Sequence, residues 1–388
     1  MNALRFDDLA KAAATRLSRR SALKGATPAF AALAGLIARN PQIASAQATA
    51  ATPLASPAAS EPRIRKNVVS LSPEERMAFV DAVVAIKNTP SPWAPSISVY
   101  DQFVFWHREA FDCALMAAHM GPAIWPWHRM FLLLFEEQLR LVDPSVTLPY
   151  WDWTVDNQPG GALWGDDLMG GTGDPDQGFA VVTGPFRKDV WPLVIFDVND
   201  PIAAPYLVRD LGAGGMAPTL PTSADVAAAL AMPTYDSAPW NETSDPAVSF
   251  RNFLEGWREC AGDLCTADPF NHPTCSGSHE MHNRVHLWVS GEFAFAHQGL
   301  RTRSGPFGTM AFNSSPNDPV FFLHHANIDR IWSGWLARHG EAYLPDSGAM
   351  IGHNADDGMW PFAEIGMDVT PRMTLSDRAL GFEYDALP

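Results

Sequence analysis

Histidine is the residue type in this chain whose number and spacing could support chemistry. The sequence holds twelve histidines but only four cysteines, which favours imidazole chemistry over thiol chemistry. Two groups stand within or beside apolar segments: His107, His119 and His128 form the first, and His282, His286 and the adjacent pair His324-His325 form the second. His282 and His286 are four residues apart, so on a helix both side chains lie on one face.

These two groups predict metal binding. Neutral imidazole binds copper, zinc, iron and nickel, and three imidazoles per metal leave a coordination position open for substrate. A single histidine on an apolar helix face is more often a packed residue than a ligand, but two such groups favour ligands. Ligation by histidine alone suits redox or oxygen chemistry on copper, or hydrolysis on zinc. The segment His282-Asn283-Arg284-Val285-His286 lacks the glutamate that H-E-x-x-H zinc peptidases use as general base.

The helices that must position these histidines can be predicted from caps and apolar periodicity. Ser72, Pro73 and Glu75 form a capping box at the start of one helix. Further helices are predicted over residues 100–118, 127–142, 250–260, 282–289 and 318–339. Residues 154–248 and 291–315 read as long loops with short elements. The expected fold is mainly α with little β, and no domain boundary is visible after residue 62.

Composition narrows the class of protein. The formal net charge is −16, which argues against nucleic acid as a partner, because phosphate binding needs clustered Lys and Arg. Hydrophobic residues make up 47% of the chain and charged residues 18%, so a large core is expected and disorder is not.

The N-terminal residues have the features of an export signal. Residues 1–48 contain Ser18-Arg19-Arg20-Ser21, then a short apolar run and a cleavage pattern at Ala44-Ser45-Ala46. They resemble a twin-arginine signal, which predicts an exported, periplasmic or extracellular protein with no membrane attachment in its mature form. An amphipathic leader helix or an uncleaved anchor is the alternative. Residues 49–62 read as a flexible linker and residues 63–388 as the functional domain.

Longer motifs around the histidines resemble those of the tyrosinase family. The segment AHMGPAIWPWHR at 118–129 and the segment LPYWDW at 148–153 resemble the first copper region of tyrosinases. The segments HNRVHLWV at 282–289, NDPVFFLHH at 317–325 and DRIW at 329–332 resemble the second. The resemblance covers roughly residues 98–338 and is specific, because several motifs recur in the same order.

The resemblance implies an antiparallel four-helix bundle that holds two copper ions, with long loops and little β. By this match His107, His119 and His128 bind one copper, and His282, His286 and His325 bind the other. The family's ligand is the second histidine of the His-His step, so His324 is expected to be a packing residue; periodicity alone does not separate the two. Some members link a cysteine to the second histidine of the first group, but Ala117 stands at that position, so no thioether is expected.

The resemblance also implies an activity. Tyrosinase-type phenol oxidases use dioxygen to hydroxylate monophenols at the ortho carbon and to oxidise catechols to ortho-quinones, so the expected partners are dioxygen and a phenolic or catecholic small molecule. By their motifs Glu255 and Asn283 would hold a water that takes the phenol proton; the alternative for Glu255 is a carboxylate on a helix surface. The rival functions are a catechol or ortho-aminophenol oxidase without monophenolase activity, and a hemocyanin-like oxygen carrier.

Several smaller predictions concern the surroundings of this site. A disulfide is plausible among Cys260, Cys265 and Cys275, all of which lie in an insertion at 259–279. Asp329 and Arg330 are expected to form a structural ion pair with a neighbouring helix. Four tryptophans near the motifs are expected to be core residues: Trp127, Trp151, Trp153 and Trp288. The sequence carries no signal for the oligomeric state.

Overall fold

A computed structural model describes residues 61–111, 118–196, 204–213, 217–257, 280–291 and 308–388. These residues all belong to one compact unit, Ala59–Pro388. The predicted signal at 1–48 and nearly all of the predicted linker lie outside the described residues, as do the insertion at 259–279 with its cysteines and Ala117.

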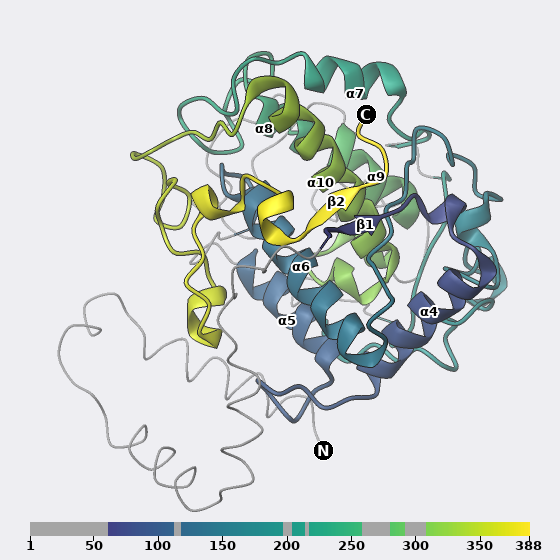
Figure 1. Ribbon diagram of the computed structural model, residues 1–388. Coiled ribbons are helices and arrows are strands. Elements are labelled where there is room, and N and C mark those ends of the chain that lie inside the picture. Colours follow the sequence, from purple (N-terminus) through teal and green to yellow (C-terminus); the bar gives the residue numbers. More distant parts are fainter. Residues whose placement is uncertain (1–60, 112–117, 197–203, 214–216, 258–279, 292–307) are drawn as a thin grey trace, which may run out of the picture. The chain divides into compact units, whose positions relative to one another are not determined.

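Three helices of the N-terminal half begin close to their predicted positions (Figure 1). Helix α4, Pro73–Lys87, starts with the predicted capping box, in which Ser72 and Glu75 bond each other's backbone N–H. Helix α5, Val99–Ala110, is capped by Ser98; the prediction ran on to residue 118, of which 112–117 lie outside the described residues. Helix α6, Ile124–Val142, starts before Pro126, which is tolerated in the first helical turn because its missing N–H needs no partner there.

The described residues of the C-terminal half form four more helices. Helix α7 spans Ser223–Leu230, and helices α9 and α10 span Met281–Ser290 and Val320–His339. Helix α8, Phe250–Glu255, is shorter than predicted. It ends because Gly256 has a φ of 99°, a left-handed conformation, and a Cβ there would lie 1.9 Å from the Glu280 carbonyl oxygen. The prediction that helix continues to residue 260 is therefore wrong.

Little β structure and many single turns of 3₁₀-helix complete the fold. Strands β1, Arg63–Arg65, and β2, Phe382–Tyr384, pair in parallel with Ile64 opposite Glu383. The 3₁₀ turns lie in the loops, at Val68–Ser70, Ala162–Trp164, Pro175–Gln177, Thr309–Ala311, Ser315–Asn317, Phe362–Ile365, Pro371–Thr374 and Arg378–Leu380. The mainly helical class and the long loops were therefore predicted correctly.

Aromatic packing holds the histidine-bearing helices together. Helix α6 packs against α4 and α10, and α9 packs against α10. Phe135 of α6 and Phe322 of α10 stack with ring centroids 3.6 Å apart. The four tryptophans named above are all buried, which confirms that they are core residues.

A buried ionic network joins strands β1 and β2 to α6 and α10. The Asp329 carboxylate accepts hydrogen bonds from Arg129 Nε at 2.6 Å and from the Tyr384 hydroxyl at 2.6 Å. Arg65 bonds Glu136 at 2.9 Å and lies 3.5 Å from Asp329. The predicted ion pair with a neighbouring helix is confirmed for Asp329, whereas Arg330 pairs with Asp152 of a loop, at 3.1 Å.

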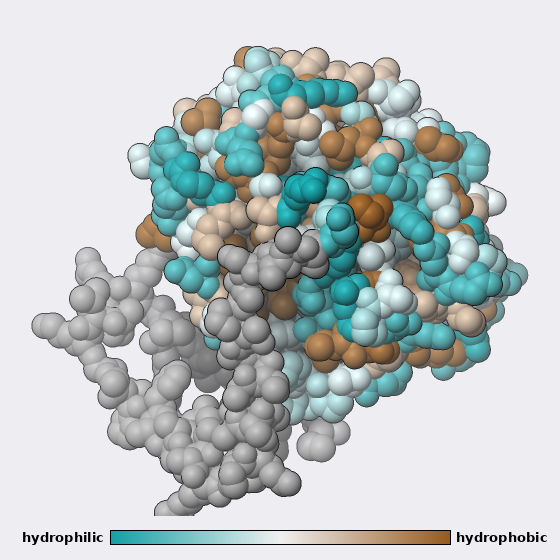
Figure 2. Space-filling view, in the orientation of Figure 1, coloured by the Kyte–Doolittle hydropathy of each residue, from teal (hydrophilic) through white to brown (hydrophobic). Residues whose placement is uncertain are grey.

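In the view of Figure 2, hydrophobic residues lie among hydrophilic ones over the coloured surface. Isolated exposed apolar side chains are ordinary on a protein surface. Within the part of the chain that the structure describes, no helix combines the length and apolar character needed to cross a membrane.

Candidate metal centre

The first histidine group converges in space. His107 comes from α5, His128 from α6, and His119 from the turn that leads into α6. The ring centroid of His119 lies 4.8 Å from that of His107 and 4.9 Å from that of His128. Each side chain is between 1 and 3% exposed, and each offers one nitrogen to a cluster in which all ligand atoms lie within 4.8 Å. The structure thus brings together residues that are distant along the chain.

Backbone carbonyls set the tautomer of two of these rings. His107 Nδ1 lies 2.6 Å from the Asn313 carbonyl, and His128 Nδ1 lies 2.8 Å from the Ile124 carbonyl. Since a carbonyl oxygen only accepts, both Nδ1 atoms carry the proton and both Nε2 atoms keep a lone pair. Those Nε2 atoms are buried and bond to no described residue. A buried lone pair without a donor is the arrangement that a metal ion satisfies.

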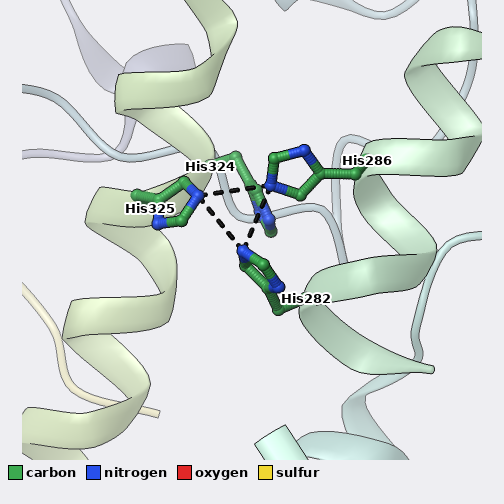
Figure 3. A group of neighbouring side chains, drawn as sticks. All are labelled: His282, His286, His324 and His325. Carbon is green, nitrogen blue, oxygen red and sulfur yellow. Dashed lines mark hydrogen bonds between the residues drawn. The ribbon is translucent and has the colours of Figure 1, made fainter. Parts of the chain in front are cut away.

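The second group has the same character, shown in Figure 3. The Nε2 atoms of His282, His286 and His325 lie 3.1 to 3.2 Å from one another. His286 Nδ1 donates to the Met310 carbonyl at 2.7 Å, and His282 Nδ1 donates to Asn283 Oδ1 at 2.9 Å. The Nε2 atoms of these two rings are therefore acceptors only. Three converging imidazole nitrogens fit copper or another imidazole-binding metal.

His324 belongs to the same cluster but is arranged differently. Its ring lies nearly parallel to that of His282, with centroids 5.2 Å apart, behind the Nε2 triangle in Figure 3. Both ring nitrogens are buried and bond to no described residue. The triangle is closed by His325 and not by His324, a distinction that helical spacing alone could not make.

The two groups form one site. The rings of His128 and His325 stack with centroids 4.3 Å apart, and His119 lies 6.4 Å from His282. Phe321 stacks on His325 at 3.9 Å and meets His107 edge-on at 4.8 Å. Two metal ions bound to these groups would be close neighbours, as in two-metal catalytic sites.

Burial keeps these imidazoles neutral. Removal from water lowers the pKa of His107 to about 3 and that of His286 to about 4. The pKa values of the other five histidines are lowered well below the ordinary value, mainly by burial and then by the neighbouring histidines. These five are His119, His128, His282, His324 and His325. Neutral imidazole is the form that binds metal, so the site is prepared for it at neutral pH.

Glu255 and Asn283 lie close to the two groups. Glu255 is fully buried, so the alternative of a surface carboxylate is wrong. Its Oε1 accepts the Met120 N–H at 2.6 Å and its Oε2 accepts from Arg251 at 3.0 Å. Burial raises the pKa of Glu255, against the opposing charge of Arg251. Asn283 uses its oxygen on His282, while its Nδ2 is buried and bonds to no described residue.

Some residues that hold the site were missed in the sequence. The carbonyls of Asn313 and Met310 orient ligand rings, but a backbone carbonyl has no sequence signal. His353, a lone histidine in the C-terminal loops, bonds the backbone of Ala123 near the first group. No motif marked it.

Comparison with known proteins agrees with this geometry. The tyrosinase family, described as the common central domain of tyrosinase, matches residues 97–338. A tyrosinase of Streptomyces lincolnensis is 39% identical over 77% of this chain and 92% of its own. A grixazone synthase of Streptomyces griseus subsp. griseus is 36% identical over 73% of this chain and 87% of its own.

The fold comparison agrees as well. The structure of a polyphenol oxidase from Thermothelomyces thermophila aligns with a TM-score of 0.56 and 23% identity, over 84% of this chain and 89% of that one. By its central domain and its Streptomyces relatives, the chain belongs to the tyrosinase family, whose members are copper oxidoreductases with a dicopper site.

Proposed function

We propose that this protein is a phenol oxidase that hydroxylates monophenols at the ortho carbon and oxidises catechols to ortho-quinones. His107, His119 and His128 would hold one copper ion, and His282, His286 and His325 the other. The observation that carries the proposal is the pair of adjacent, buried imidazole groups whose free lone pairs converge. When bound, the two copper ions supply the chemistry with dioxygen.

The residues around the histidines suit a phenolic substrate. A phenol hydroxyl has a pKa of about 10, so a monophenol must lose its proton to bind a metal well. Asn283 Nδ2 is a buried donor that bonds to no described residue, and it could orient a water. Glu255 has a raised pKa, which brings a carboxylate closer to the range of a general base. A carboxylate has about four acceptor positions, so Glu255 can accept from that water besides Met120, Arg251 and Trp257.

The test compares two substrates on copper-loaded protein. Oxygen uptake is measured with a monophenol and with the corresponding catechol, for the unaltered chain and for Asn283→Asp and Glu255→Gln. Both variants should lose more monophenol turnover than catechol turnover, because a catechol has a more acidic hydroxyl. Glu137→Gln, which changes an exposed carboxylate paired with Arg63, is the control and should leave both rates unchanged. Equal losses on the two substrates would contradict the proton-transfer role.

A catechol or ortho-aminophenol oxidase without monophenolase activity is the second candidate. The observation in its favour is that both Glu255 oxygens already accept a hydrogen bond, which weakens the carboxylate as a base. The same assay decides: oxygen uptake with the catechol and none with the monophenol would support this candidate. Oxygen binding without turnover of any phenol would instead support an oxygen carrier.

We also propose that residues 1–48 direct export through a twin-arginine route. The support is the Arg19-Arg20 pair before an apolar run. Changing both arginines to lysine should hold the protein inside an exporting bacterium, measured by fractionation and immunoblot. Unchanged export of that variant would contradict the assignment.

A further inference from the structure

The turn between His119 and α6 is held by side chains from three distant segments. Met120 N–H donates to Glu255 of α8 at 2.6 Å. The Tyr235 hydroxyl donates to the Pro122 carbonyl at 2.6 Å. Ala123 N–H donates to His353 Nδ1 at 3.2 Å. Three backbone groups within four residues are therefore bonded to side chains that lie more than a hundred positions away in the sequence.

His119 needs such support more than its two partners. His107 and His128 each donate Nδ1–H to a backbone carbonyl, which fixes the ring. His119 Nδ1 is buried and bonds to no described residue, and His119 lies before the first residue of α6. The position of its ring thus depends on the backbone of the turn and on packing against Phe111, whose ring centroid lies 4.2 Å away.

The conformation of the turn is one that needs outside support. Met120 has a φ of 58°, in the left-handed region, which carries an energetic cost for a residue with a side chain. The Met120 N–H donates to the buried Glu255 carboxylate, and this charge-assisted hydrogen bond offsets that cost. Such strained residues persist where the surroundings over-determine them, and they cluster at functional sites.

The contact with His353 also depends on the residue type in the turn. A Cβ added at Gly121 would lie 2.5 Å from His353 Nδ1 and 2.6 Å from Cε1 of the same ring. Only glycine at 121 therefore lets the buried ring of His353 approach closely enough to accept from Ala123. The Tyr343 hydroxyl in turn donates to the His353 carbonyl at 2.7 Å, which anchors the loop that carries the ring.

We propose that Tyr235, His353 and Glu255 act as positioning residues that place His119 for the copper ion of the first group. The inference rests on the proposed function, because it takes His107, His119 and His128 to be ligands of one copper ion. It extends that function to Tyr235 and His353. The contacts described above join these two residues to the backbone of the turn and not to the histidine rings. Loss of such outer supports weakens metal binding by about 10-fold to 100-fold.

The experiment measures copper affinity rather than turnover. Apo-protein is titrated with copper against a competing chelator, for the unaltered chain, Tyr235→Phe, His353→Leu and His353→Asn. Tyr235→Phe and His353→Leu should weaken one of two copper equivalents by about 10-fold or more. His353→Asn should restore most of the affinity, because its Oδ1 can accept from Ala123 N–H. In a His325→Ala background, which keeps only the first group complete, the remaining equivalent should weaken in the same way.

A matched control separates positioning from general stability. Tyr384→Phe also removes one buried hydroxyl that donates at 2.6 Å, but its partner is Asp329 in the ionic network. It should lower thermal stability and leave both copper affinities unchanged. In the Cu(II) form, electron paramagnetic resonance should show an uncoupled ion in Tyr235→Phe at two added equivalents and none in Tyr384→Phe.

The outcomes are distinct. Two unaltered affinities in Tyr235→Phe and His353→Leu would overturn the positioning role and leave the proposed function standing, as would equal weakening in Tyr384→Phe. Failure of the unaltered chain to bind two copper ions would overturn the proposed function and the inference together.

Discussion

Acidification of the copper-free protein should unfold it far above the pH at which carboxylates titrate. Six histidines of the metal centre are at most 3% exposed: His107, His119, His128, His282, His324 and His325. Burial lowers the pKa of each below the ordinary value of about 6.5. The unfolded chain takes up protons at these rings as the pH falls through about 6.5, whereas the folded chain does not. Stability is therefore present above that pH and is lost below it.

The size of the effect follows from the number of protons. Between about pH 7.5 and about pH 5.5, each buried neutral histidine reduces the free energy of unfolding by about 1.4 kcal/mol. Six such residues give about 8 kcal/mol, which is comparable with the whole stability of a typical domain, about 5–15 kcal/mol. Glu136 adds little here: burial would raise its pKa, but Arg65 holds it below the ordinary value, outside this pH range. Burial raises the pKa of Glu255, so this carboxyl acts in the opposite sense to the histidines as the pH falls.

The assay is urea unfolding of chelator-treated protein, followed by tryptophan fluorescence at the two pH values. His324→Gln removes one of the six rings and should reduce the loss of stability by about 1.4 kcal/mol. A total loss below about 2 kcal/mol in the unaltered apo-protein would refute the reasoning, because it would mean that the rings accept protons in the folded state.

Two further predictions concern the elements around the site. Asp329→Asn leaves Arg129 and Arg65 without a full counter-charge in the buried network. It should lower the free energy of unfolding, measured in urea at pH 7.5, by about 3–5 kcal/mol. An unchanged unfolding midpoint would contradict a structural role for the network. Gly256→Ala places a Cβ against the Glu280 carbonyl and should displace α8 from the start of α9; lower stability together with weaker copper binding is expected, and wild-type values of both would contradict the close approach.

Local sequence signals correctly predicted the helices whose formation depends on residues close by in the sequence. The capping box at Ser72 and the apolar periodicity of α6 depend on neighbours a few residues away, and both were correct. The end of α8 was missed although Gly256 is a local stop signal for a helix, because apolar residues continue past it; its contact with Glu280 has no local signal.

The candidate site was predicted to the level of which histidines belong together. Motifs indicated two groups, and the structure brings each group together. Helical spacing alone did not separate His324 from His325; the resemblance assigned His325 as the ligand, and the spatial difference between the two arises where α9 and α10 pack together. The supports from Asn313, Tyr235 and His353 could not be predicted, since each reaches its partner only through the tertiary fold.

The parallel pairing of β1 with β2 has a consequence for the order of folding. Arg65 and Tyr384 share Asp329 although they are 319 residues apart, so the buried Asp329 carboxylate has its full set of hydrogen-bond donors only when β2 is present. In a chain that is still being synthesised, Asp329 can contact Arg129 and Arg65 but lacks the hydrogen bond from β2. Contacts between residues so distant in sequence form slowly. Completion of the core, and with it a formed metal centre, is therefore expected to follow synthesis of β2. Ending the chain after Gly381 should leave it sensitive to protease, whereas resistance equal to that of the full chain would contradict this order.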